Sequence, residues 1–88
     1  ATELVLYQNV PNPFLEATDV RFSIPSTSKV IFTVYDVNGR EILRKSDSYQ
    51  AGNHTINLTR NEINVTGVMY YKIETDSGTA SKKMIQIR

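Results

Sequence analysis

Residues 29–42 read KVIFTVYDVNGREI, and this stretch decides the fold class. Val30, Phe32 and Val34 alternate with a second set of side chains, and this period of two predicts a β-strand. The second set is also largely apolar, so we expect a central strand that is covered on its back. Asn38-Gly39 then joins two apolar runs. This pair predicts a type I′ hairpin, because both of its residues tolerate positive φ.

Similar runs recur about every ten residues on either side of this hairpin, with turn signals between them. They cover residues 1–7, 19–24, 54–58, 68–75 and 79–87, and together with the two hairpin strands they make seven. No segment shows a helical period. Seven short strands predict an all-β, immunoglobulin-like antiparallel β-sandwich, although a closed barrel has the same periodicity.

The alternation also predicts which side chains form the core of the sandwich, since residues two apart share a face. The expected core residues are Phe22, Ile24, Val30, Phe32, Val34, Ile42, Ile56, Leu58, Met69, Tyr71, Ile73, Ile85 and Ile87.

Composition excludes several classes of protein. The 88 residues suffice for one domain, and the absence of Cys excludes both a disulfide scaffold and a Cys-based zinc site. No apolar run approaches the length of about 18 residues that a membrane helix needs. Ten basic and nine acidic residues leave a net charge of +1, without the basic face of a nucleic-acid binder. We therefore expect no nucleic-acid partner.

Candidate catalytic residues are few. His54 is the only histidine, and Asp47 and Ser48 complete a Ser-His-Asp set on paper, but proximity in sequence is no evidence for triad geometry. The acidic residues are spread along the chain without the ligand spacing of a calcium loop. We expect no enzyme, no metal or cofactor site and no small-molecule substrate.

Two segments stand out from the strand pattern. Residues 8–14 read QNVPNPF, in which two prolines fix φ and two asparagines can bond backbone groups in a tight corner, while Phe14 closes the end of the core. Residues 82–88 read KKMIQIR and combine cations with alternating apolar side chains. This second pattern fits a last strand with a solvated basic face. It also fits a segment that a partner recognises as a signal.

Six blocks along the chain resemble a known family. They are LYQNVPNPF (6–14), VRFSIP (20–25), VYDVNGREI (34–42), AGNHTI (51–56), GVMYYKI (67–73) and KKMIQIR (82–88). Their order is similar to that of the type A C-terminal sorting domain of the type IX secretion system of Bacteroidetes. The motif residues matched are Gln8, Asn9, Pro11, Asn12, Pro13, Phe14, Tyr35, Asp36, Gly39, Arg40, Gly52 and Gly67.

The resemblance implies a seven-strand sandwich that directs an attached cargo protein through the outer membrane, to the cell surface or the medium. It implies three partners, namely the outer-membrane translocon, a shuttle protein and a cell-surface sortase. Residues 1–3 would then end a linker from the cargo, and residues 4–88 would form the sorting domain. The expected recognition residues are Lys82, Lys83, Met84, Ile85, Gln86, Ile87 and Arg88.

An accessory binding module for carbohydrate or surface adhesion is the alternative. Five Tyr and three Phe could stack on sugars, but tyrosine also covers the faces of sandwiches, and tryptophan is absent. The two functions differ at the last strand, because a sorting signal needs that strand to end the chain, whereas a binding module tolerates an extension.

Overall fold

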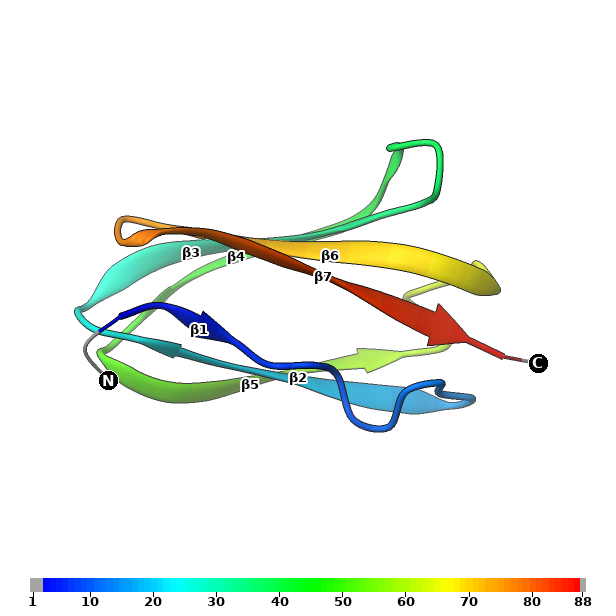
Figure 1. Cartoon of the computed structure of the whole chain (residues 1–88), viewed down its shortest axis with the longest axis horizontal. Helices are drawn as coiled ribbons and strands as arrows, with labels where there is room; N and C mark the ends of the chain where they lie inside the picture. The colour runs from blue at the N-terminus through cyan, green and yellow to red at the C-terminus, as the bar shows by residue number, and fades with distance from the viewer. Residues whose placement is uncertain (1–2, 88) are drawn as a thin grey trace.

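The computed structural model describes residues 3–87 and has seven strands in two layers (Figure 1). The predicted all-β sandwich is confirmed. Residues 1 and 2 of the predicted first strand, and Arg88, lie outside the described residues. None of the described residues belongs to a helix that could cross a membrane. The strands are β1 (Val5–Leu6), β2 (Ala17–Ile24), β3 (Ser28–Tyr35), β4 (Glu41–Tyr49), β5 (Gly52–Thr59), β6 (Gly67–Thr75) and β7 (Gly78–Gln86).

The strand order is that of an immunoglobulin-like sandwich. One sheet has the order β1-β2-β5 and the other has the order β4-β3-β6-β7, with antiparallel pairing throughout. Strands 1, 2 and 5 correspond to A, B and E of the immunoglobulin fold, and strands 3, 6 and 7 correspond to C, F and G. The fourth strand joins the sheet of strand 3. The central position expected for the strand of residues 29–37 is therefore confirmed, but the strand ends at Tyr35 and Val37 lies in the loop that follows.

The core lies between the sheets and contains most of the predicted residues. The confirmed members are Phe22, Ile24, Val30, Phe32, Val34, Ile56, Leu58, Met69, Tyr71 and Ile73. The structure adds Leu6, Val20, Ile63 and Met84, and Phe14 is buried as the corner pattern predicted. Ile42 is a correction, because it is only half-buried against the core. The register places Val34 opposite Leu43 and Tyr35 opposite Glu41, so Ile42 lies in a bulge without a partner.

The last strand is a second correction, because its two faces are the reverse of those predicted. Met84 and Gln86 are buried, whereas Ile85 is half-buried and Ile87 is 47% exposed. Cross-strand partners share a face, and Met84 pairs with the buried Met69. The pairing with β6 therefore turns Ile85 and Ile87 away from the core.

The hairpin at Asn38-Gly39 is confirmed, but the predicted type I′ turn is wrong. Gly39 has φ +83°, whereas no residue other than glycine has positive φ in the described part of the chain. The Gly39 N–H donates to the Asp36 carbonyl at 3.0 Å, and the Asp36 N–H donates to the Arg40 carbonyl at 2.9 Å. This is a three-residue loop in which a type I turn is followed by a left-handed glycine. The loop projects beyond the sandwich (Figure 1).

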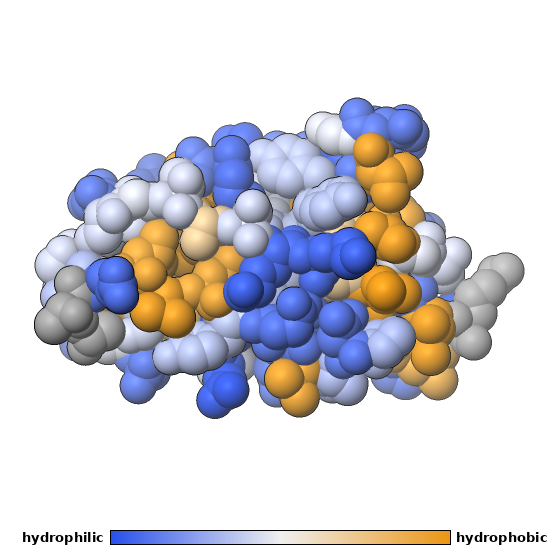
Figure 2. All heavy atoms as spheres, in the orientation of Figure 1, coloured by the Kyte–Doolittle hydropathy of each residue, from blue (hydrophilic) through white to orange (hydrophobic). Residues whose placement is uncertain are grey.

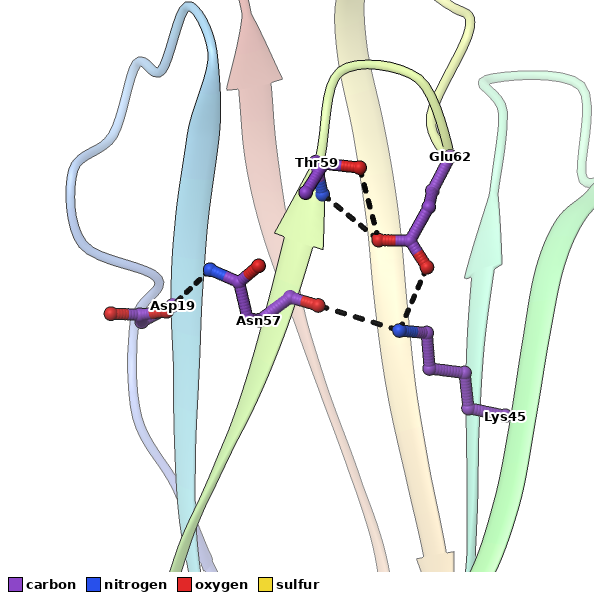
Figure 3. A network of polar contacts seen from close by, with 5 residues as sticks. All are labelled: Asp19, Lys45, Asn57, Thr59 and Glu62. Atoms are coloured by element: carbon purple, nitrogen blue, oxygen red, sulfur yellow. Dashed lines mark hydrogen bonds and ion pairs between the residues drawn. The ribbon is translucent and has the colours of Figure 1, made fainter.

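A polar network ties the two sheets together on the side of β4 and β5 (Figure 3). The Lys45 ammonium group of β4 lies 2.9 Å from a Glu62 carboxylate oxygen and donates to the Asn57 carbonyl of β5 at 3.4 Å. The second Glu62 oxygen accepts hydrogen bonds from the amide and hydroxyl of Thr59. Lys45 and the Thr59 amide hold the pKa of Glu62 below its ordinary value, against a smaller opposing effect of burial. Lys45 thus covers the edge between the two sheets, as inward-pointing charges do on other edge strands.

Candidate functional site

Residues 82–86 of the predicted recognition segment form the second half of β7, an edge strand of the four-stranded sheet, and Ile87 follows the strand. Lys83, Ile85 and Ile87 point away from the core, whereas Lys82, Met84 and Gln86 share the inner face of the strand. The two lysines that are neighbours in sequence therefore lie on opposite faces. A partner that approaches from outside meets Lys83, Ile85 and Ile87.

The free edge of this half of β7 is already covered by the segment of residues 8–14, called the motif segment below. The Gln8 side-chain amide donates to the Lys83 carbonyl at 2.7 Å, and the Asn12 side-chain oxygen accepts from the Ile85 N–H at 3.0 Å. Phe14 exchanges two backbone hydrogen bonds with the strand, its N–H to the Ile85 carbonyl (2.9 Å) and its carbonyl from the Ile87 N–H (2.8 Å).

Arg60 completes this cover, because its guanidinium group donates to the carbonyls of Leu15 and Ile87. On the edge of β7 that faces away from β6, all backbone N–H and carbonyl groups from the Lys83 carbonyl to the Ile87 carbonyl thus have hydrogen-bond partners within the chain. A strand from another protein could add here only by displacing the motif segment.

The motif segment is itself held by buried polar contacts. The Asn9 side-chain amide donates to the Thr18 hydroxyl at 3.0 Å and to the Pro11 carbonyl at 3.1 Å. The Asn9 backbone N–H donates to the Tyr71 hydroxyl, which donates in turn to the Tyr7 carbonyl. Burial raises the pKa of Tyr71 to about 12, so the hydroxyl keeps its proton at neutral pH. The polar corner expected from the two asparagines is confirmed, and so is the burial of Phe14.

A comparison with protein-family models covers both the motif segment and the last strand. The family described as the secretion system C-terminal sorting domain matches residues 9–88. The chain belongs to this family. A search of curated proteins finds no match.

The family is that of type IX secretion, and its members are sorting signals rather than catalysts. A sorting domain of this family implies interaction with the type IX secretion machinery and export to the cell surface or the extracellular space. The predicted family and the coarse function are thereby confirmed.

The motif residues of the sorting domain do not gather at one place. Gln8, Asn12 and Phe14 contact β7, whereas Tyr35, Asp36, Gly39 and Arg40 belong to the end of the β3–β4 hairpin. Pro11 accepts from the Asn9 side chain, and Pro13 directly precedes Phe14. Gly52 and Gly67 are the first residues of β5 and β6, and both have positive φ. Most of these motif positions therefore shape turns and corners.

Asp36 is the residue that organises the hairpin loop. One carboxylate oxygen accepts from the backbone N–H groups of Asn38 and Arg40, both at 2.9 Å, and the other lies 3.2 Å from the Arg40 guanidinium group. The bond from the Arg40 N–H is the main reason that the pKa of Asp36 lies below its ordinary value. A charged Asp36 thus favours the type I turn at pH 7.

The residues considered for catalysis do not form a triad. His54 packs against the rings of Tyr49 and Phe22, and its Nε2 lies 2.6 Å from the Gln50 carbonyl oxygen. Asp47 accepts instead from the backbone N–H of Ser48. Within residues 3–87, no three His, Cys, Asp or Glu residues come together as metal ligands.

Sequence reasoning missed three residues of the site. Tyr71 was assigned to the core for its ring, but a buried tyrosine hydroxyl usually has a polar partner, and this rule could have indicated its role. Thr18 and Arg60 belong to no motif. Their contacts depend on the packing of the sheets, so no local signal could have found them.

Proposed function

We propose that this domain directs an attached cargo protein across the outer membrane by type IX secretion, for anchoring at the cell surface or for release. Its partners are the translocon, a shuttle protein and a cell-surface sortase, and residues 82–88 are the part that they recognise. Residues 4–88 form the sorting domain, and residues 1–3 end a linker from the cargo. The observation that carries this proposal is the family match over residues 9–88.

The contacts of β7 give the proposal a physical basis. A recognition strand must keep one shape during export, and an edge strand with open backbone groups invites pairing with other chains. The motif segment closes that edge with its own hydrogen bonds from Lys83 to Ile87. Because the backbone of β7 is held in place, its exposed side chains need little ordering when a partner binds, which lowers the entropic cost of binding.

A reporter fusion tests the proposed function directly. Residues 1–88 are placed at the C-terminus of a reporter with its own signal for export to the periplasm, in a bacterium competent for type IX secretion. We expect the reporter to become accessible to protease added to intact cells, and to stay in the periplasm of a strain that lacks the translocon.

Two results would contradict the proposal. Retention of a folded fusion in the periplasm of the competent strain would show that the domain is not a sufficient signal. Surface exposure without the translocon would show that export follows another route. In either case, an accessory binding module would become the better hypothesis, and purified domain would then be tested on polysaccharides.

A further inference from the structure

The covered edge of β7 limits how a partner can read this strand. The backbone groups on the edge of β7 that faces away from β6 are hydrogen-bonded to the motif segment from Lys83 onward. The side chains of Met84 and Gln86 point inward and are buried. Apart from the half-buried Lys82, the accessible side chains are Lys83, Ile85 and Ile87, which point away from the core. Lys83 and Ile85 belong to the outer face of the four-stranded sheet, so this face is the surface through which the described part of the segment can be recognised without unfolding.

On this outer face, aromatic, aliphatic and basic side chains meet in two adjacent rows. Tyr35, Tyr70 and Lys83 are successive cross-strand partners on β3, β6 and β7, and Val68 pairs with Ile85 in the next row. Direct partners in antiparallel strands have Cβ atoms about 5 Å apart, so these side chains form one continuous surface. We call these five residues the tyrosine–lysine face.

The tyrosine–lysine face is open to solvent. Tyr70 is 44% exposed, Lys83 is exposed, and Tyr35, Val68 and Ile85 are half-buried. Figure 2 shows hydrophobic side chains gathered at the end of the molecule near the C-terminus and up to the β3–β4 hairpin. A tyrosine-rich surface with aliphatic neighbours is typical of the centre of a protein–protein interface.

The charges around this face favour an acidic partner. On the same side of the sheet, Arg44 pairs with Glu41 and Lys72 pairs with Glu74, and Lys72 also lies over the Tyr35 ring. Lys83 takes part in no ion pair among residues 3–87. Lys83, the cross-strand partner of Tyr70, is thus available to a carboxylate of a partner.

We infer that the tyrosine–lysine face binds an acidic protein surface with an apolar centre, presented by a component of the export machinery. This inference rests on the proposed function and names the part of the domain that carries it. Val68 and Ile85 favour a protein over an anionic polysaccharide, because aliphatic side chains gain most from burial against apolar groups. Lys83 supplies the charge, and Tyr70 supplies the central contact area.

The experiment compares two pairs of variants in the reporter fusion. Tyr70→Ala and Lys83→Glu alter the face, and Tyr7→Ala and Lys29→Glu are matched controls. Tyr7 is 40% exposed just before the motif segment and contributes only its backbone carbonyl to the site, and Lys29 is exposed at the far end of β3. We expect each face variant to lose at least about tenfold of the surface-exposed reporter, and each control to stay within about twofold of wild type. Lys83→Arg keeps the charge and should retain export.

Melting of the purified domains shows whether each variant remains folded. Export of folded Tyr70→Ala and Lys83→Glu fusions at the wild-type level would overturn the inference, while the proposed function would stand. Retention of the wild-type fusion in the competent strain would instead contradict the proposed function, and the inference would fall with it. Binding of the domain to anionic lipopolysaccharide that Lys83→Glu abolishes, with export unchanged, would identify a glycan site and overturn the protein partner.

Discussion

Replacing Tyr71 with phenylalanine removes a single hydroxyl group from the contact between β6 and the motif segment. The ring is completely buried and stays in place, so the substitution leaves no large cavity. The lost hydroxyl accepts from the Asn9 N–H at 3.0 Å and donates to the Tyr7 carbonyl at 2.8 Å. Asn9 is only 1% exposed, so water cannot easily replace the hydroxyl at its N–H group.

The magnitude follows from these two bonds. A buried donor left without a partner costs about 1–3 kcal/mol, whereas the Tyr7 carbonyl belongs to an exposed residue and adds less than about 1 kcal/mol. We therefore expect Tyr71→Phe to lower the free energy of unfolding by about 2–3 kcal/mol. For a domain of this size, that loss lowers Tm by roughly 10–20 °C.

Tyr70→Phe is the matched control, because the neighbouring tyrosine is 44% exposed and its hydroxyl makes no hydrogen bond within residues 3–87. Urea unfolding of the two purified variants measures the difference, and equal m-values would show that both unfold from similar states. If Tyr71→Phe unfolds within about 0.5 kcal/mol of Tyr70→Phe, the hydroxyl does not hold the motif segment, and our account of the site is wrong.

Three further predictions concern the sandwich. Phe32→Ala should lower the free energy of unfolding by about 3–5 kcal/mol in urea, and a loss below roughly 1 kcal/mol would contradict its place in the core. Gly39→Val should cost at least about 1 kcal/mol and lower the melting temperature, because valine strains at φ +83°; an unchanged melting curve would refute the turn. Lys45 lowers the pKa of Glu62, so the ion pair should add less than about 1 kcal/mol to the free energy of unfolding. This stabilisation should be complete at pH values above the ordinary pKa of 4.5 and vanish as pH falls through the lowered pKa. Glu62→Gln should therefore be less stable than wild type at pH 7 and equally stable at low pH, and a constant difference would refute the pairing.

Strand phase could be predicted wherever apolar and polar residues alternate clearly. In β6, Met69, Tyr71 and Ile73 were assigned correctly, because Tyr70 and Lys72 mark the other face. In β7 the order is Met84-Ile85-Gln86-Ile87, which puts an apolar residue on each face. Two isoleucines on the core face form a more apolar set than a methionine and a glutamine, so the pattern predicted the wrong face. The register with β6 decides the matter, and register depends on the whole sheet.

Turn type and long-range polar contacts were beyond sequence reasoning for different reasons. Asn38-Gly39 suits a type I′ turn, but the Asp36 carboxylate bonds two backbone N–H groups and stabilises the alternative. The bonds from the Gln8 side chain to the Lys83 carbonyl and from the Ile85 N–H to the Asn12 side chain join residues 75 and 73 positions apart. A single sequence contains no signal for such pairs. It indicated the motif segment and the last strand separately, but not that one covers the other.

The contact between the motif segment and β7 also makes folding depend on complete synthesis. Lys83 is synthesised 75 residues after Gln8. The motif segment therefore cannot form its contacts with β7 until almost the whole sandwich has been synthesised. A polypeptide that stops short of Lys83 lacks the backbone groups that bond Phe14 and Asn12. It also leaves part of the β6 edge unpaired, and such edges are targets for aggregation and proteolysis. The contact between the motif segment and β7 therefore forms only after translation has passed Lys83.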